Sequence, residues 1–408
     1  MSIPSDALAR KAPGGRFRLL DGIVVLDLTT SLAGPYGSML LSDFGAEVIK
    51  IERPGTGDDS RGWTPPAHAG QSLWYQSVNR DKQSVTLDYS NPAGRELLYG
   101  LVRKADVLIT NQLPRVQLKL GIDWETVRAV RPDLVYGSLT GFGLGGTRSN
   151  DPCYDLIAEG YSGIMDLTGE LANDPQKIGT PAADLLGGAD LALGILAALI
   201  ERNRTGHGHL VEISLVDSMA RFLTPRIVSY LGSGILPRRS GAKDSVIAIY
   251  QVFQTSDDPL TLGLPNDAIW QRFCAAVERP EWATDPDFST SNARVGKRAE
   301  LVGNIQAILS TLPRDHWLDL FRSKKVPAGP INRLDEVTKD EELLKRGLFY
   351  AMAESGIPQV GLGIRIDGVD SGYDRAPPLL GADTDGVLQR LLDLTPAQIA
   401  NLRQEGVL

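Results

Sequence analysis

The sequence predicts an α/β protein with a large domain built on a mainly parallel sheet and a smaller α+β domain. Three observations support this fold class. The segment Gly22–Arg53 contains a complete strand, helix and strand, strands and helices continue to alternate up to Leu215, and the composition changes after about Leu231. Such alternation favours a parallel sheet with helices on both faces and ligands at the carboxyl ends of its strands.

The first strand–helix–strand unit predicts a binding corner. Ile23–Leu28 is an apolar β-branched run, Gly34-Pro35 begins a helix, and Ala46–Ile51 alternates like a second strand that ends just before Arg53. The loop Thr29–Ala33 precedes the helix, whose free N–H groups and dipole favour an anion. We therefore expect a nucleotide-like ligand at this corner.

The later elements follow from the same patterns. We expect helices over 93–103, 124–130 and 185–200, and strands over 107–110, 134–139 and 210–215. Asn111 and Thr140 follow two of these strands, at the edge where Arg53 is expected. A strand pair, 246–253 and 260–264, and helices near 268–277, 298–312 and 314–324 form the second domain. We assign 1–235 to the large domain, 241–336 to the small domain and 337–408 to a segment that returns to the large domain.

Composition excludes several classes of protein. The net charge of −8 offers no general attraction for nucleic acid, and two cysteines and four scattered histidines predict neither a disulfide framework nor a metal site. The apolar stretch 185–200 is interrupted by Asp190, so no membrane span is expected. Residues 1–20 lack an apolar signal-peptide core and are expected to form a frayed lead-in to a cytoplasmic protein.

Two local motifs can be interpreted either as functional or as purely structural. Gly141–Gly146, GFGLGG, matches the spacing of a dinucleotide-binding fingerprint, but a polar turn with a proline follows it where a helix should begin, so a flexible turn is favoured. Asp184 immediately precedes the predicted helix 185–200. It is either an N-cap or a nucleophilic carboxylate that the helix N–H groups keep ionised, and the local sequence leaves both open.

Taken together, segments along almost the whole chain resemble the class III coenzyme A transferases, a family that includes formyl-CoA:oxalate transferase, carnitine-linked CoA transferase and α-methylacyl-CoA racemase. The resemblance implies a Rossmann-like large domain made from both chain ends, a small domain from the middle, and an interlocked homodimer. The segments that carry it are VLDLTTSLAGPYGSMLLSDFGAEVIKIERPGTGDDSRGW, NRDKQSVTLD, ADVLITNQLP, DLVYGSLTGFG, YDLIAEGYSGIMDLTG, ADLLGGADLALGILAAL, RTGHGHLVEISLVDSM, VPAGPIN and APPLLGADTDGVL.

The resemblance also implies roles for individual residues. The family's catalytic aspartate falls on Asp184, and an active-site tyrosine falls on Tyr154. Gly187 and Gly188, read as a turn, are candidate backbone donors to an oxyanion. The positions implied to contact CoA, with Thr140 added from its place at a strand end, are Thr30, Ser31, Leu32, Ala33, Arg53, Asn111, Lys119 and Thr140.

The expected activity is CoA transfer between small carboxylic acids through mixed anhydrides and an aspartyl-CoA thioester, with succinyl-CoA and another dicarboxylate as the leading pair. Acyl-CoA is a substrate of this chemistry, which needs neither a metal nor a further cofactor. Relatives that act on oxalate carry a lysine in place of Pro152 and a glycine run that the segment 241–249 lacks, which argues against oxalate. That segment is a candidate lid that keeps water from the anhydride.

Two alternatives remain at this point. The first is an α-methylacyl-CoA racemase, but racemases of the family carry a histidine at the position of Tyr154, and a phenol is a poor base near neutral pH. The second is a CoA-binding protein without catalysis, which would hold if Asp184 were only a helix cap.

Overall fold

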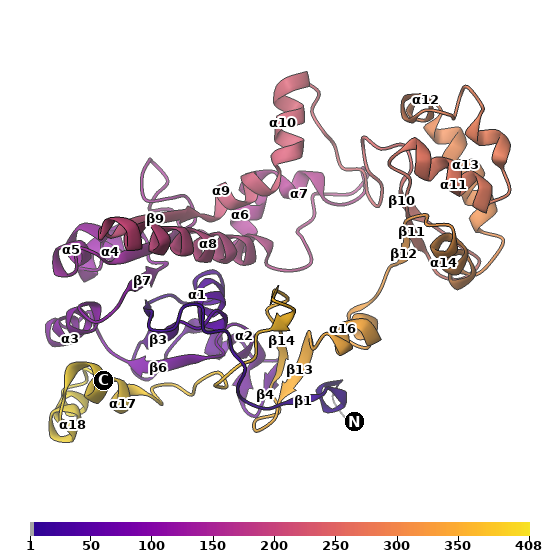
Figure 1. The fold of residues 1–408 in the computed structure, drawn as a ribbon. Coiled ribbons are helices and arrows are strands. Elements are labelled where there is room, and N and C mark those ends of the chain that lie inside the picture. The colour runs from indigo at the N-terminus through magenta and orange to yellow at the C-terminus, as the bar shows by residue number, and fades with distance from the viewer. Residues whose placement is uncertain (1–3) are drawn as a thin grey trace. The chain divides into compact units, whose positions relative to one another are not determined.

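The computed structural model describes residues 4–408, which divide into two compact units. The first unit comprises the residues up to Ser162, Ile178–Thr224 and Thr338–Leu408, and the second comprises Gly163–Lys177 and Pro225–Val337. Figure 1 shows the elements of both units. Residues 163–177 and 225–235, which we expected in the large domain, cluster with the second unit.

A six-stranded parallel sheet organises the first unit. Its strands are β2 (Val24–Asp27), β3 (Glu47–Glu52), β6 (Lys82–Thr86), β7 (Val107–Thr110), β8 (Val135–Thr140) and β9 (His209–Ser214). They lie in the order β6-β3-β2-β7-β8-β9, and every neighbouring pair is parallel. Numbered along the chain this is 3-2-1-4-5-6, the Rossmann order, whose ligand crevice opens where the order reverses. That reversal lies between β2 and β7.

Strand β6 was missed in the sequence because its residues, KQSVT, are mostly polar. Polar groups are tolerated inside a sheet when they find partners. The buried Lys82 ammonium pairs with Asp27 at 3.1 Å, and the Ser84 hydroxyl donates to Glu52 at 2.6 Å. Asp27 lies on β2 and Glu52 on β3, both far from β6 in the sequence, so short-range periodicity carries no sign of these partners.

Helices cover the sheet, and two of them meet closely. The main ones are α1 (Ala33–Asp43), α3 (Pro92–Val102), α4 (Pro114–Leu120), α5 (Trp124–Val130), α6 (Asp155–Ser162), α8 (Ala182–Thr205) and α9 (Leu215–Phe222). A methyl group added at Gly188 of α8 would lie 2.4 Å from the Ala33 carbonyl oxygen, and one at Gly37 of α1 would lie 2.7 Å from the Gly188 carbonyl oxygen. The two glycines thus let the backbones of α1 and α8 touch.

Helix α8 is longer than expected, beginning at Ala182 rather than near 185 and ending at Thr205 rather than near 200. By length and composition it is the one helix within residues 4–408 that could cross a membrane. It packs against α1, β8, β9 and α9, and Asp184 and Asp190 lie within it. This packing is that of a core helix.

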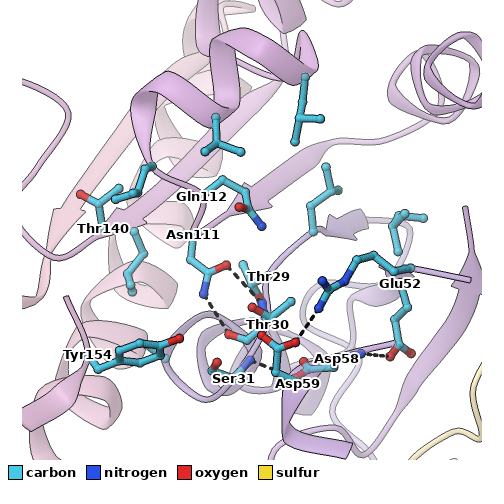
Figure 2. A pocket seen from close by; sticks show the side chains of 18 of the residues that line it. Thr29, Thr30, Ser31, Glu52, Asp58, Asp59, Asn111, Gln112, Thr140 and Tyr154 are labelled. Carbon is cyan, nitrogen blue, oxygen red and sulfur yellow. Dashed lines mark hydrogen bonds and ion pairs between the residues drawn. The ribbon is translucent and has the colours of Figure 1, made fainter. Parts of the chain in front are cut away.

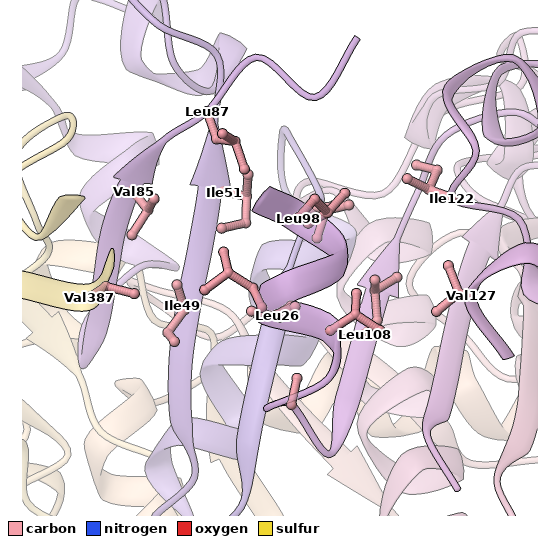
Figure 3. Packing of buried hydrophobic residues seen from close by; sticks show 14 of the residues in the cluster. Leu26, Ile49, Ile51, Val85, Leu87, Leu98, Leu108, Ile122, Val127 and Val387 are labelled. Atoms are coloured by element: carbon pink, nitrogen blue, oxygen red, sulfur yellow. The ribbon is translucent and has the colours of Figure 1, made fainter. Parts of the chain in front are cut away.

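The core of the first unit lies between the sheet and its helices (Figure 3). Leu26, Ile49 and Leu108 on the three central strands are fully buried, together with Leu98 of α3. Val387, which belongs to the C-terminal segment, packs into the same cluster. Burial of apolar side chains at this density is the main force that holds such a unit together.

The C-terminal segment ends in two helices, α17 (Thr384–Leu392) and α18 (Pro396–Gln404), where one was expected. It also completes the sheet edge: Asp383 accepts a hydrogen bond from the Ser84 N–H at 2.9 Å, and Thr384 accepts one from the Thr86 N–H at 3.0 Å. The described part of the lead-in is likewise anchored instead of frayed, because β1 (Arg10–Lys11) pairs in parallel with β13 (Phe349–Met352); residues 1–3 lie outside the described residues.

The second unit is an antiparallel sheet covered by helices. Strands β10 (Tyr250–Phe253), β11 (Leu260–Gly263) and β12 (Ala328–Pro330) pair in that order. Trp270, Phe273 and Phe321 are buried among α11 (Asp267–Ala276), α13 (Arg298–Leu309) and α14 (Arg314–Ser323).

The remaining elements are short or join the larger ones. They are η1 (Pro4–Ala7), η2 (Asp59–Gly62), β4 (Ala67–His68), β5 (Gln71–Ser72), α2 (Leu73–Ser77), α7 (Ile164–Leu167), α10 (Thr224–Ser233), η3 (Pro280–Ala283), α12 (Ser291–Gly296), α15 (Leu334–Val337), α16 (Glu341–Lys345), β14 (Pro358–Val360), β15 (Arg365–Ile366) and β16 (Val369–Asp370).

Candidate active site

A cavity of about 510 Å³, here called the main cavity, opens at the carboxyl ends of β2, β7 and β8. Figure 2 shows its lining, in which the loop after β2 faces Asn111 after β7 and Thr140 at the end of β8, with Tyr154 at one side. Asp184 of α8 also lines it. The cavity therefore occupies the crevice that the strand order defines.

Two side chains hold the loop after β2. Asn111 accepts a hydrogen bond from the Thr30 N–H at 3.2 Å and donates to the Thr30 carbonyl at 2.9 Å, while Asp58 accepts from the Ser31 N–H at 3.0 Å (Figure 2). Ser31 adopts a φ of +71°, an uncommon backbone conformation for a residue other than glycine. The N–H groups of Thr30 and Ser31 thus donate to side chains of the protein and are not free for a ligand. Ala33 begins α1 without a side-chain cap, so no capping side chain occupies the first amides of α1.

Buried charged side chains also hold the loop after β2 in place. The Lys50 ammonium donates to the Thr29 carbonyl at 2.7 Å and pairs with Asp58 at 2.8 Å, and Asp27 lies between Lys50 and Lys82. Burial alone would raise the pKa of Asp27, but the two ammonium groups hold it well below its usual range. Burial lowers the pKa of Lys82 to about 8, opposed by Asp27. This network makes the loop a rigid part of the site.

The predicted CoA-contacting residues do not all meet at the main cavity. Thr30, Ser31, Ala33, Arg53, Asn111 and Thr140 line it. Lys119 is exposed on α4 and lies outside the lining, and Leu32 lines a separate cavity of about 360 Å³ with Tyr36, Met39 and Trp74. Arg53 is 60% exposed and pairs with Asp59 at 2.5 Å, so in this structure its charge is already partnered.

Asp184 is not the N-cap of α8. Because the helix begins at Ala182, Asp184 is the third residue of its first turn. Asp155 takes the capping role instead, accepting hydrogen bonds from the N–H groups of Ala183 at 2.8 Å and Asp184 at 3.3 Å. Within residues 4–408 no side chain or backbone group bonds to the Asp184 carboxylate. The carboxylate is left free to react.

The electrostatics of Asp184 differ from the sequence expectation. Burial, and then the nearby charge of Asp155, raise the pKa of Asp184 to about 7. The expectation that helix N–H groups keep this carboxylate strongly ionised was therefore wrong, since Asp155 occupies those donors. Burial and the same Asp184 charge raise the pKa of the Cys153 thiol to about 11, so this neighbour is a poor nucleophile.

Gly187 and Gly188 form no turn. They lie inside α8, where backbone N–H groups serve the helix, so the expectation that they donate to an oxyanion was wrong. Their small size serves packing, because a methyl group at Gly187 would lie 2.7 Å from a methyl carbon of Leu215 and one at Gly188 would strike the backbone of α1.

Tyr154 and Thr140 flank the cavity. The Tyr154 side chain is 66% exposed and precedes α6. Thr140 accepts a hydrogen bond from the Gly143 N–H at 2.9 Å, so Gly141–Gly146 forms a turn as expected and no helix follows it at once.

Asp155, Asp58 and Lys50 are site residues that the sequence reasoning missed. One signal was present for Lys50, a charged residue between Ile49 and Ile51 in an otherwise apolar strand. Asp155 directly follows Tyr154, a predicted site residue, but its hydrogen bonds to α8, like the contact of Asp58 with the loop after β2, arise only in the folded chain. Among residues 4–408 no group of three or more His, Cys, Asp or Glu side chains is arranged to hold a metal ion.

The segment 241–249 belongs to the second unit and is tied to it. Asp244 accepts hydrogen bonds from the N–H groups of Val246 at 2.7 Å and Ile247 at 2.8 Å, and pairs with Arg226 at 3.0 Å. Its role as a lid stays a prediction.

Comparisons with known proteins agree on one family. A family model described as CoA-transferase family III matches residues 20–384. A succinyl-CoA:glutarate CoA-transferase of Mus musculus is 34% identical over 95% of this chain and 90% of its own length. An acetyl-CoA:oxalate CoA-transferase of Acetobacter aceti is 36% identical over 90% of this chain and 94% of its own length. The crystal structure of a CAIB/BAIF family protein from Brucella suis is similar, with a TM-score of 0.80, 37% identity and coverage of 91% of this chain and 99% of that one.

Proposed function

The chain belongs to CoA-transferase family III, an enzyme family, and we propose that it moves CoA from succinyl-CoA, or a similar acyl-CoA, to a small dicarboxylic acid. Both relatives described above are named for a dicarboxylate, glutarate in one and oxalate in the other. Glutarate resembles succinate in carrying two carboxylates on a short chain, so a pair of this kind fits the proposal best.

The observation that carries the proposal is the state of Asp184. Its carboxylate lines the main cavity, has no bonding partner within residues 4–408, and is relieved of helix capping by Asp155. A residue needed only as a cap would use its side chain on the helix amides. A carboxylate that faces a ligand cavity without a partner is what nucleophilic catalysis needs.

The reaction follows from this carboxylate. Asp184 attacks the acyl-CoA carbonyl and the C–S bond breaks. CoA leaves as a thiolate, and a mixed anhydride of the acyl group and Asp184 remains. The thiolate attacks the Asp184 carbonyl of that anhydride, which releases the donor acid and leaves an aspartyl-CoA thioester. The acceptor carboxylate then attacks this thioester and frees the thiolate again, and the thiolate takes the acceptor acyl group and releases Asp184. One thioester replaces another at each turnover.

Backbone amides and one cation suggest where the phosphates of CoA bind. The first amides of α1, beside Ala33, are suited to a phosphate, and Arg53 adds a cation at the same edge. With a net charge of −8 the chain offers phosphates only such local attraction. Asn111, by clamping the loop after β2, keeps this backbone in place.

The test is CoA exchange followed by mass spectrometry, with a panel of acyl-CoAs and free acids. We expect succinyl-CoA to exchange with glutarate or a similar dicarboxylate. Asp184→Ala should lose at least 10³-fold in kcat, in the range seen when a covalent nucleophile is removed. The matched control is Asp190→Ala, which removes a carboxylate six residues further along α8 that bonds to Ser218 and Arg221 and does not line the cavity. This control should keep its turnover.

Two results would contradict the proposal. The first is an active Asp184→Ala variant. The second is rapid uptake of deuterium at the α-carbon of a chiral 2-methylacyl-CoA with no CoA exchange, since that result identifies a racemase. A third measurement supports the covalent route: wild-type enzyme given acyl-CoA and hydroxylamine should become modified at Asp184.

A homodimer and a cytoplasmic location are further parts of the proposal. The first unit carries exposed apolar side chains that a second copy would cover, namely Leu156, Ile157 and Tyr161 on α6, Leu193 and Ile200 on α8, and Phe222 on α9. Light scattering after size-exclusion chromatography should give about twice the mass of the chain, and a monomer would contradict this part.

A further inference from the structure

Asp155 has an unusual position beside the catalytic carboxylate. It is the first residue of α6, and its carboxylate accepts hydrogen bonds from two backbone N–H groups in the first turn of α8, those of Ala183 and Asp184. Its negative charge thus lies at the N-termini of two helices, where helix dipoles favour an anion. None of the reaction steps above uses this residue.

We propose that Asp155 is a positioning residue for the reaction: it fixes the first turn of α8, and its negative charge acts on the neighbouring Asp184 carboxylate. The proposal rests on the proposed function, because it assigns Asp155 a role in the chemistry of Asp184. Asp155 itself touches no reacting atom.

The geometric part of the argument concerns the backbone. The Asp184 side chain has no bonding partner within residues 4–408, so its direction depends on the backbone that carries it. That backbone belongs to the first turn of a helix, whose N–H groups lack partners in the helix itself. Asp155 bonds to the N–H of Asp184 and to that of the preceding residue, and thereby aims the carboxylate into the main cavity.

The electrostatic part concerns the charges around Asp184. After burial, Asp155 is the group whose charge raises the pKa of Asp184, which reaches about 7. A carboxylate of this basicity is a stronger nucleophile once ionised and a less stable leaving group in the anhydride than an ordinary aspartate.

Of the titratable groups on the surrounding elements, Asp155 is the one whose charge acts on Asp184. Arg221 bonds to Asp190, further along α8. Glu159 accepts a hydrogen bond from the Ile178 N–H at 2.9 Å. The groups on the elements packed against α8, and on the segment before α6, are Tyr36, Asp43, Tyr136, Cys153, Tyr154, Asp155, Glu159, Tyr161, His209, Glu212, Asp217 and Arg221.

Three variants separate the two effects. Asp155→Asn keeps a side-chain oxygen that can accept from the Ala183 N–H but removes the charge. Asp155→Ala removes both the acceptor and the charge. Asp123→Ala is the control for losing a helix cap, because Asp123 caps α5 by accepting from the Thr126 N–H at 3.1 Å and lies outside the main cavity.

The first measurement needs no turnover. Carbon-13 NMR of labelled aspartate carboxyl groups, with the Asp184 signal identified by its loss in Asp184→Asn, should show Asp184 titrating near pH 7 in the wild type. In Asp155→Asn the midpoint should fall by at least one pH unit, while Asp123→Ala keeps the wild-type midpoint. An unchanged midpoint in Asp155→Asn would overturn the electrostatic role. If no acyl-CoA pair exchanged at all, the proposed function would fail while this titration still decided the effect of Asp155.

The second measurement is the kcat of CoA exchange at pH 9, where Asp184 is ionised in every variant. Asp155→Ala should fall at least tenfold below Asp155→Asn, with the KM for acyl-CoA within threefold, and Asp123→Ala should keep the wild-type kcat. Equal kcat values for the two Asp155 variants would overturn the positioning role. Asp155→Asn, which preserves the cap, still decides the electrostatic role if the alanine variant does not fold.

Discussion

Two aspartates at one helix end have different tasks because their surroundings differ. Asp155 accepts backbone hydrogen bonds, which stabilise a carboxylate, whereas Asp184 is half-buried beside that negative charge without a donor of its own. The residue that has no partner is the one that we propose as the nucleophile. At the scale of single residues, the site therefore trades folding stability for a carboxylate of raised basicity.

Because an ionised Asp184 destabilises the fold, Asp184→Asn should raise the free energy of unfolding in a pH-dependent way. The pKa of Asp184 is raised from 3.8 to about 7 on folding, so the folded protein holds this proton more tightly than the unfolded chain does. The associated stability is complete below about pH 4 and is lost as pH rises through 7. At ~1.4 kcal/mol per pKa unit, the ionised group costs up to about 4 kcal/mol above pH 7.

The measurement is the melting temperature of wild type and Asp184→Asn at pH 5 and pH 8. The variant should melt several degrees higher at pH 8, with a much smaller gain at pH 5. Asp190→Asn is the control, because Asp190 bonds to Ser218 and Arg221, and it should show no gain. Equal gains at both pH values would mean that Asp184 does not titrate in this range.

Arg53→Ala tests the other side of the cavity. Arg53 lines the main cavity at its exposed rim and pairs with Asp59, so we expect it to exchange that partner for a CoA phosphate. The KM should rise about 5- to 50-fold for every acyl-CoA, since each carries the same phosphates, while the order of preference among acceptor acids is unchanged. Lys119→Ala, outside the cavity lining, should have a smaller effect. A change confined to one acceptor would place Arg53 at the acyl end instead.

At the scale of elements, the site depends on how α1 and α8 meet. The contact of Gly37 with Gly188 lets the two helices approach so closely that both of their N-terminal turns reach the main cavity. One turn offers backbone amides and the other the Asp184 carboxylate.

Gly188→Ala should therefore harm both stability and activity. Its methyl group would lie 2.4 Å from the Ala33 carbonyl oxygen, which is backbone and cannot move aside cheaply. We expect a loss of about 1–3 kcal/mol in the free energy of unfolding and a lower kcat, measured by urea denaturation and CoA exchange. Gly303→Ala in α13 is the control: with no atom within 4 Å of the added carbon, it should stabilise the protein by about 0.5–1 kcal/mol. Equal effects of the two substitutions would mean that the glycine contact does not govern the packing of α1 on α8.

At the scale of the whole molecule, the chain ends complete the first unit. The segment Thr338–Leu408 belongs to the unit that carries the six-stranded sheet, although most of the second unit lies before it in sequence. Leu388 and Ile399 pack in the same core as Leu26 and Leu108. The stability of the sheet therefore depends on residues that follow the second unit in the sequence.

Leu388→Ala tests this dependence. The side chain is fully buried, so its truncation should cost about 2–5 kcal/mol and speed amide hydrogen exchange in β3 and β6. Leu379→Ala is the control from the same segment, since Leu379 is 60% exposed, and it should have little effect. Unchanged exchange in β6 after Leu388→Ala would contradict a shared core.

The sequence by itself determined the α/β class, most helices and strands of the parallel sheet, and Asp184 as the candidate nucleophile. Apolar periodicity and turn residues are local properties, and the resemblance to a family depends on residues in linear order. Tertiary structure alone decided the strand β6 and the anchoring of β1, because the partners that stabilise them lie far away in the chain. The second helix at the C-terminus, in contrast, has a local signal that the sequence reasoning missed, a capping box between Thr395 and Gln398 with Pro396 in the first turn. Tertiary structure also decided that Asp155 caps α8, that Gly187 and Gly188 pack helices, and that Lys119 lies outside the cavity. Burial, charge and hydrogen bonding of a side chain depend on which segments surround it, and only the folded chain specifies those.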